Sequence, residues 1–268
     1  MTITINKKEY PLYTLDAGAQ ELSKKRWDSI AKPLHSLGKM EDLVIQTAGI
    51  TGDANVTYEK KALIVMCADN GVVAEGVTQS EQNVTAIVSE NFLSDKATAA
   101  ILCKQTGAEI FPIDIGIAVD TKLENHKIAY GTKNMAKEPA MTREEAEKAM
   151  EVGIEKVREL SGQGYKIIAT GEMGIGNTTT SSALASYFLQ EDVEKMTGRG
   201  AGLTSKALEK KIAVVRKAIA DYSPAFTDAI DALAALGGFD IAGMAGVFLG
   251  GAIYRVPIVM DGFISSTA

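Results

Sequence analysis

Unbroken runs of apolar residues, separated by segments with helical spacing, constrain the fold of this chain most strongly. Residues 62–67 read Ala-Leu-Ile-Val-Met-Cys, without one polar side chain. Such a run is typical of a strand that is covered on both faces of a parallel sheet. Further strands are expected at 109–113, 166–169 and 256–260, and helices at 84–93, 95–106, 142–160, 205–222 and 240–253. This alternation predicts an α/β fold with a doubly wound, mostly parallel, Rossmann-like sheet, and ligands beyond the carboxyl ends of its strands.

The first part of the chain has a different pattern. Residues 15–31 and 37–50 each carry apolar side chains at helical spacing, and a segment with Pro33 interrupts them. We therefore expect two domains: an N-terminal helical segment of a small domain at 1–55, and an α/β domain at 56–268.

Composition excludes several classes of protein. The 268 residues are 46% hydrophobic and carry a net charge of −6. No run reaches the roughly 18 apolar residues of a membrane helix, and no stripe of Lys and Arg suits a nucleic-acid backbone. We expect neither a membrane nor a nucleic acid as partner.

Cysteine and histidine give no sign of a disulfide or a metal site. Cys67 and Cys103 lie in apolar stretches without paired spacing, and His35 and His126 have no partners at the spacing of metal ligands. The sequence therefore predicts a cytoplasmic protein without a bound metal.

The segment 170–180, Thr-Gly-Glu-Met-Gly-Ile-Gly-Asn-Thr-Thr-Thr, is the strongest candidate for a ligand site. A strand ends there, glycines permit close approach, and the start of a helix presents free N–H groups, which together suit a phosphate. Its glycine spacing matches neither a dinucleotide fingerprint nor a P-loop. Alternatively, the glycines make a tight turn and Thr178–Thr180 cap the helix. Glu172 favours the functional interpretation, because a carboxylate at a strand exit suits a ribose hydroxyl or proton transfer.

Two further segments fit the same crevice. Gly198, Gly200 and Gly202 precede a helix whose exposed face is expected to carry Lys206, Lys210 and Lys211, although a flexible loop before a surface helix explains them equally well. The last strand is followed by Asp261 and small hydroxyl residues. It weakly suggests a diphosphate-sugar transferase, but it has one acid where that motif has two.

Several blocks, in order, resemble the family of nicotinate-nucleotide:dimethylbenzimidazole phosphoribosyltransferases. The most specific block is Gly-Glu-Met-Gly-Ile-Gly-Asn-Thr-Thr at 171–179. The other similar blocks lie at 36–43, 68–72, 74–77, 139–142, 198–200, 235–238 and 261–264. The resemblance extends from Leu15 to Ala268.

The resemblance implies transfer of 5-phosphoribose from nicotinate mononucleotide to a nitrogen of a benzimidazole-type base. An α-ribazole-type phosphate and nicotinate would be the products. A pyridinium is already a good leaving group, so no cofactor or Mg²⁺ is expected. The resemblance also implies a homodimer.

By motif position, the resemblance assigns Glu172 as one of two catalytic glutamates. It implies that phosphate and ribose contact Gly174, Gly176, Asn177, Thr178, Thr179, Gly200, Gly202, Lys211 and Ser265. It implies that the base contacts Asp69, Ser80 and Val88.

The chain also departs from the family pattern. Asn70 stands where the family has histidine, and Val88 where some members carry glutamine, so another base, or a phenolic acceptor used by an unlike-subunit pair, stays open. The family's C-terminal Gly-Glu-Gly block, with the main general base, has no match. We therefore expect the C-terminal half of the small helical domain to be missing. The alternative function is a binding subunit, or a truncated chain, that depends on a partner for the missing carboxylate.

Overall fold

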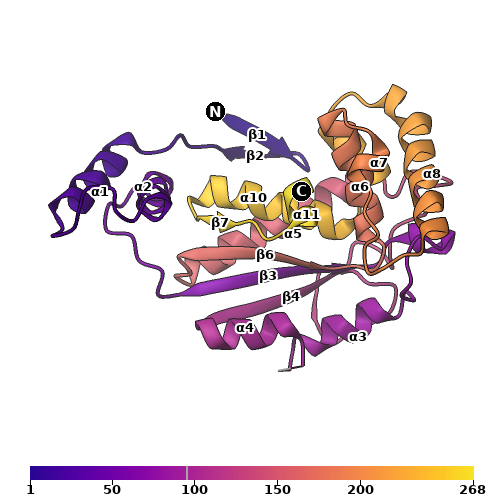
Figure 1. Cartoon of the computed structure of the whole chain (residues 1–268), viewed down its shortest axis with the longest axis horizontal. Coiled ribbons are helices and arrows are strands. Elements are labelled where there is room, and N and C mark those ends of the chain that lie inside the picture. Colours follow the sequence, from indigo (N-terminus) through magenta and orange to yellow (C-terminus); the bar gives the residue numbers. More distant parts are fainter. Residues whose placement is uncertain (95) are drawn as a thin grey trace.

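A five-stranded parallel sheet forms the centre of the molecule (Figure 1). The computed structural model describes residues 1–94 and 96–268. Along the sheet the strands follow the order β5-β4-β3-β6-β7, and every pair is parallel. Their bounds are β3 Lys61–Ala68, β4 Ala108–Gly116, β5 Glu124–Asn125, β6 Ile167–Met173 and β7 Ile258–Val259. The last strand is shorter than the predicted 256–260.

Helices cover both faces of this sheet, which confirms the doubly wound fold. Helices α5 (Arg143–Gly162) and α10 (Phe239–Tyr254) pack on one face, and α3 (Val84–Asn91) and α4 (Thr98–Thr106) pack on the other. The predicted helix at 95–106 thus begins at Thr98, and Asp95 lies outside the described residues. The larger apolar core lies on the α5 and α10 side, and a smaller one lies beneath α3 and α4.

The remaining helices lie around the carboxyl ends of the strands and beside the core. Helix α8 has the predicted bounds, Ser205–Tyr222, while α7 and α9 were not predicted. These elements are η1 Gly71–Glu75, α6 Asn177–Leu189, α7 Val193–Met196, α8 Ser205–Tyr222, η2 Ser223–Ala225, α9 Ala229–Leu236 and α11 Phe263–Thr267.

The N-terminal residues begin with a hairpin that the sequence analysis missed. Strands β1 (Thr2–Ile5) and β2 (Lys8–Pro11) pair antiparallel, and Glu151 of α5 accepts hydrogen bonds from Asn6 and Lys8. Helices α1 (Ala17–Ser29) and α2 (Lys39–Thr51) follow and pack on each other at one end of the molecule (Figure 1). The side chain of Arg255 joins them to the α/β core, since its Nε donates to the carbonyl of Ile50 at 2.9 Å.

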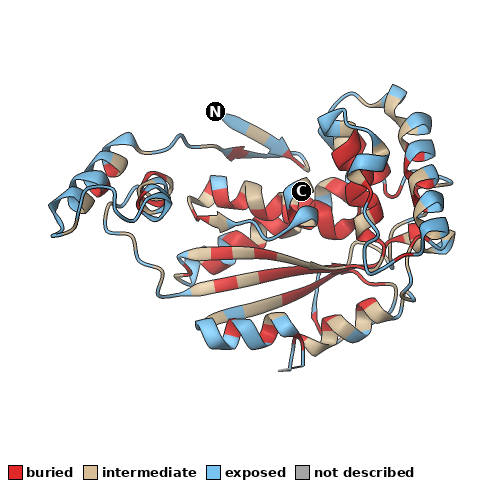
Figure 2. Cartoon of the chain, viewed as in Figure 1, coloured by how far each residue is buried: buried red, intermediate tan, exposed pale blue. Residues whose placement is uncertain are grey.

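Burial separates these two parts of the chain. Figure 2 shows α10 mostly buried, the strands buried or intermediate along most of their length, and the α1 and α2 pair mostly exposed. The prediction that the C-terminal half of the helical domain is missing is not supported. The last residues form α11, which packs against α6, α10 and β6 in the α/β core.

Helix α5 shows how local sequence and packing combine. Its N-terminus is fixed by a capping box, in which Thr142 and Glu145 exchange hydrogen bonds. Its glycine at 153 and Gly246 of α10 then let the two backbones touch. A Cβ on Gly246 would lie 1.9 Å from the carbonyl oxygen of Met150. On the sheet side of α10, Gly243 likewise permits close approach, since a Cβ there would lie 2.9 Å from the sulfur of Met66 on β3.

We expect Gly246→Ala to lower the free energy of unfolding by about 1–3 kcal/mol, because the added methyl group forces the two helices apart. Urea unfolding followed by circular dichroism measures the change. Gly162→Ala is the matched control, since a Cβ there meets nothing within 4 Å. Equal stability of both variants would contradict the proposed close contact.

Candidate functional site

The crevice between the carboxyl ends of β3 and β6 gathers the polar residues of the motif at 170–180. The two strands are neighbours, and their register pairs Met66 with Glu172. The chain leaves β3 toward α3 on one face and leaves β6 toward α6 on the other. Adjacent strands whose connections diverge in this way open a crevice where ligands bind in α/β proteins.

Three side chains from three elements meet at the exit of β6. The Asn177 side-chain nitrogen, at the start of α6, donates to a Glu172 oxygen and to Oδ2 of Asp240, the latter at 2.9 Å. Asp240 is completely buried at the start of α10, and its Oδ1 accepts from the Ile241 N–H at 3.0 Å. One amide therefore holds two carboxyl groups close together.

This environment makes Glu172 easier to protonate. Burial, and after it the charge of the nearby Asp240, raise its pKa to about 7, although hydrogen bonds from Asn177 and the Gly174 backbone act in the opposite direction. Burial also raises the pKa of Asp240 above its ordinary value, against the hydrogen bond from Asn177. A carboxyl group that titrates near neutral pH suits proton transfer.

Lys211 of α8 lies beside this cluster as a fully buried cation. Its ammonium donates to Oγ1 of Thr178 at 2.8 Å and to the Gly198 carbonyl at 3.3 Å. Burial alone lowers its pKa to about 8, and within residues 1–94 and 96–268 no carboxylate pairs with it. The prediction that Lys211 lies on the exposed face of the helix is therefore wrong, although Lys206 and Lys210 are exposed.

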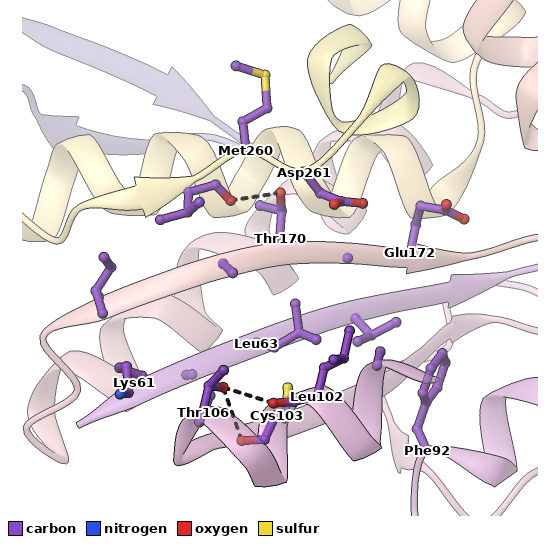
Figure 3. A pocket seen from close by; sticks show the side chains of 18 residues that line it. Lys61, Leu63, Phe92, Leu102, Cys103, Thr106, Thr170, Glu172, Met260 and Asp261 are labelled. Atoms are coloured by element: carbon purple, nitrogen blue, oxygen red, sulfur yellow. Dashed lines mark hydrogen bonds between the residues drawn. The ribbon is translucent and has the colours of Figure 1, made fainter. Parts of the chain in front are cut away.

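An apolar cavity of about 510 Å³ runs along β3 and β6 (Figure 3). Glu172 and Asp261 lie at one end of it, and Lys61 lies at the other. Its apolar lining includes Leu63, Val65, Phe92, Leu102, Val259 and Met260. The volume and the lining are those of a site for a small organic ligand.

Of the predicted phosphate and ribose residues, Thr178 and Gly200 lie next to Lys211. Gly174 and Gly176 form the turn before α6, and Asn177, Thr178 and Thr179 form its first turn. Gly200 lies next to Thr178 and Lys211, because a Cβ there would come within 3.2 Å of the Thr178 hydroxyl and 3.8 Å of the ammonium. Gly202 lies further along the same loop, and its carbonyl accepts from Gln79.

Ser265 differs from the others, because local bonds occupy its hydroxyl. Its Oγ accepts from the N–H groups of Asp261 and Gly262 and donates to the Gly262 carbonyl. These three bonds use the full capacity of a hydroxyl group.

The predicted base-binding residues lie on the β3 side of the crevice. Asp69 is buried, and its carboxylate accepts from the Ala118 N–H at 2.8 Å; burial raises its pKa. Ser80 lies in the loop before α3. Val88 packs against the small core that contains Val65 and Cys67, so it stands behind the cavity and does not line it.

Sequence reasoning missed Asp240, and the chain offered only a weak signal for it. An aspartate at the start of a helix is ordinarily explained by the helix dipole. Its burial against Glu172 is a tertiary contact. The signal for Lys211 was stronger, since Lys211, Val214, Val215 and Ala218 share the spacing of one helix face, and all four are buried.

The described residues give no sign of a metal site, a membrane-spanning helix or a cysteine pair. Among the described residues, no group of three or more His, Cys, Asp or Glu side chains is arranged to hold a metal ion. No helix in that part of the chain has the length and apolarity to cross a membrane. Cys67 and Cys103 are both buried and unpaired.

The fold and crevice define an α/β protein with a Rossmann-like sheet, and comparison with known proteins narrows its class. A phosphoribosyltransferase family model matches residues 12–268. The chain is 50% identical over 257 residues to a nicotinate-nucleotide–dimethylbenzimidazole phosphoribosyltransferase of Clostridium acetobutylicum, covering 95% of this chain and 73% of that protein. For the protein of the same name from Clostridium tetani, identity is 46% over 274 residues, covering 100% and 76%.

A solved structure agrees with these relatives. The crystal structure of CobT from Thermus thermophilus superposes with a TM-score of 0.88 at 33% identity, covering 93% of this chain and 76% of that one. The chain therefore belongs to the nicotinate-nucleotide–dimethylbenzimidazole phosphoribosyltransferase family. This confirms the resemblance and the expected enzyme class, a phosphoribosyltransferase.

The buried Lys211 predicts a pH-dependent stability. Its pKa is about 8 in the folded state, against 10.5 as the ordinary value. Between these two values the unfolded chain binds the proton and the folded chain does not, so this group makes the folded state more stable as pH rises from 8 to 10.5. Below pH 8 the full cost of burying the charge remains.

Replacing Lys211 by Met should remove this rise. We would measure urea unfolding of the ligand-free protein at pH 7.5, 9 and 10.5 for the wild type, Lys211→Met and Lys210→Met. Lys210 is the matched control, because it is the next residue along the chain and its side chain is exposed. The Lys210 variant should keep the wild-type dependence. The same pH dependence in all three proteins would contradict a buried ammonium.

Proposed function

We propose that the chain transfers 5-phosphoribose from nicotinate mononucleotide to a benzimidazole-type base, releasing nicotinate. The observation that carries the proposal is the position of Glu172. Its side chain lies at the end of an apolar cavity and is bonded to Asn177 in the first turn of α6, where the buried Lys211 also binds. The names of the relatives support the same substrates.

The phosphate is proposed to bind at Lys211 and the first turn of α6. Among the residues that the structure describes, no carboxylate pairs with the buried cation Lys211, and Thr178, which it contacts, directly follows the Asn177 that binds Glu172. The N–H groups of the first helical turn attract anions. Gly200 and Gly202 leave room for a ligand in the facing loop, and Gly174, Gly176 and Thr179 complete this proposed site with Asn177.

The aromatic base is proposed to occupy the apolar cavity. Its walls are aliphatic and aromatic, and Glu172 at one end supplies the polar group that orients the ring. Asp69, Ser80 and Val88 would then act from the β3 side, outside this lining. We retain Ser265 as a proposed ribose contact, which would require its hydroxyl to leave the turn.

The reaction needs a proton acceptor and an anchored phosphate. A ring nitrogen of the base attacks the anomeric carbon of the ribose. The bond to the pyridinium nitrogen breaks, and its electron pair stays with nicotinate. Glu172 takes the N–H proton of the base, and the held phosphate keeps the reacting atoms in line.

The proposal also covers the oligomeric state, the compartment and the domain division. We propose a homodimer that acts in the cytoplasm, and a division into residues 1–55 and 56–268. The competing function is a binding subunit that depends on a partner for a second carboxylate. Asp261 favours catalysis by this chain, because it adds a carboxylate at the same end of the cavity as Glu172.

The decisive experiment incubates the purified chain with nicotinate mononucleotide and 5,6-dimethylbenzimidazole, without added metal. Chromatography follows nicotinate and the ribotide. Formation of both in equal amounts supports the transferase. If calorimetry shows binding of the mononucleotide but no product forms, the chain is the binding subunit. If transfer requires Mg²⁺ and a diphosphate sugar, the chain is a diphosphate-sugar transferase.

Glu172→Gln should lower kcat about 10²-fold or more, because the amide cannot accept the proton. Affinity for nicotinate mononucleotide should change little, since the phosphate is held elsewhere. Steady-state kinetics and calorimetry separate the two effects. In the wild type, kcat/KM should fall as pH decreases below about 7, where Glu172 becomes protonated; loss of binding in the variant would refute the role.

Lys211→Met should weaken the binding of nicotinate mononucleotide by about 2–3 kcal/mol, the range of a charge-assisted hydrogen bond. Nicotinate riboside, which lacks the phosphate, serves as the matched ligand, and its affinity should not fall. Calorimetry with both ligands tests this. An equal loss for both would show that the variant perturbs the whole site.

A further inference from the structure

Asp240 is a buried charged group that the proposed reaction does not yet use. Its carboxylate has no exposed surface, and the groups that stabilise its charge most strongly are uncharged. Burying such a group is costly unless hydrogen bonds hold it in place. Here the hydrogen bonds come from Asn177 and from the backbone N–H of Ile241.

The surrounding backbone holds this carboxylate in one position. A Cβ on Gly174 would lie 2.5 Å from Oδ2 of Asp240, and a Cβ on Gly238 would lie 2.5 Å from Oδ1. Glycines thus bring the turn before α6 and the start of α10 against the two oxygens. Asp240 cannot turn away from Asn177 without moving these segments.

We propose that Asp240 and Asn177 are positioning residues that make Glu172 one half of a coupled carboxyl pair. Asn177 fixes the distance between the two carboxyl groups, and Asp240 supplies a negative charge that water does not screen. Glu172 then accepts and releases a proton at nearly neutral pH while its orientation stays fixed. This inference rests on the proposed function only in one respect, that the proton which Glu172 accepts comes from the aromatic base.

The other groups around Glu172 act more weakly. Asp261, after β7, also raises the pKa of Glu172, but its side chain is exposed, so solvent screens its charge. On β3, burial raises the pKa of the Cys67 thiol to about 12, which leaves it neutral. Asn177 on α6 carries no charge. Asp240 is therefore the dominant charged neighbour.

Two substitutions should move the Glu172 titration in opposite directions. Asp240→Asn removes the like charge and should lower the pKa of Glu172 by about one unit. Asn177→Leu replaces the amide by an apolar group of similar size, so the Glu172 carboxylate loses a hydrogen bond and its pKa should rise. A merely structural role would admit water and lower the pKa in both variants.

The measurement is an NMR titration of protein labelled with ¹³C in the glutamate carboxyl groups, with Glu172→Gln to assign the signal. Asp261→Asn is the control for an exposed carboxylate and should shift the titration by less than Asp240→Asn. Opposite shifts support the pair. An unchanged pKa in Asp240→Asn, or shifts of one sign in both variants, overturns it.

The titration needs no substrate, so it separates this inference from the proposed function. Opposite shifts in a protein that forms no ribotide would refute only the use of the proton. In an active protein, the acid limb of the kcat/KM profile should move with the NMR pKa, and the KM for nicotinate mononucleotide should stay constant. If Asp240→Asn does not fold, Asn177→Leu decides alone: a raised pKa supports the pair, and an unchanged or lowered pKa overturns it.

Discussion

The parallel pairing of β3 with β6 is the constraint on which the rest of the site depends. It places Glu172 beside Met66 and brings the turn after β6 next to Asn70 at the end of β3. The two connections then leave on opposite faces, so neither fills the space between them. Everything else in the crevice, the start of α10 and the loop before α8 included, is packed around this opening. A change in this pairing would displace the carboxylate and the first turn of α6 together.

The charges in the crevice are arranged with little neutralisation. Asp240 is held by an amide and a backbone N–H, and Lys211 by a hydroxyl and a carbonyl. None of these partners carries an opposite charge. Each of these groups can therefore change its charge near neutral pH. The groups of an ordinary surface ion pair, such as Lys148 and Glu144, stay charged in that range. The fold bears this cost at the crevice between β3 and β6.

Local patterns predicted those parts of the fold that local interactions determine. Both ends of α8 were predicted, because they depend on residues that contact each other along one helix. The hairpin of β1 and β2 escaped prediction because its strands have four residues each, and its turn uses Asn6 and Lys7 at positive φ without a glycine. Asp240 escaped for another reason: the contacts that link it to the site, at Asn177 and Gly174, lie far from it in the sequence. The motif around Glu172 was visible because its residues are adjacent in the chain.

The buried ammonium of Lys211 has a consequence for metabolite selection if the phosphate binds there, as we propose. A nucleoside without its phosphate would leave the buried charge uncompensated, whereas a phosphomonoester dianion would compensate it and replace hydrogen bonds that burial removed. In the proposed mode of binding, this penalty applies to unphosphorylated nucleosides whatever their base. In a mixture of nucleosides and nucleotides, such a crevice would select phosphorylated compounds before the ring of the base is recognised.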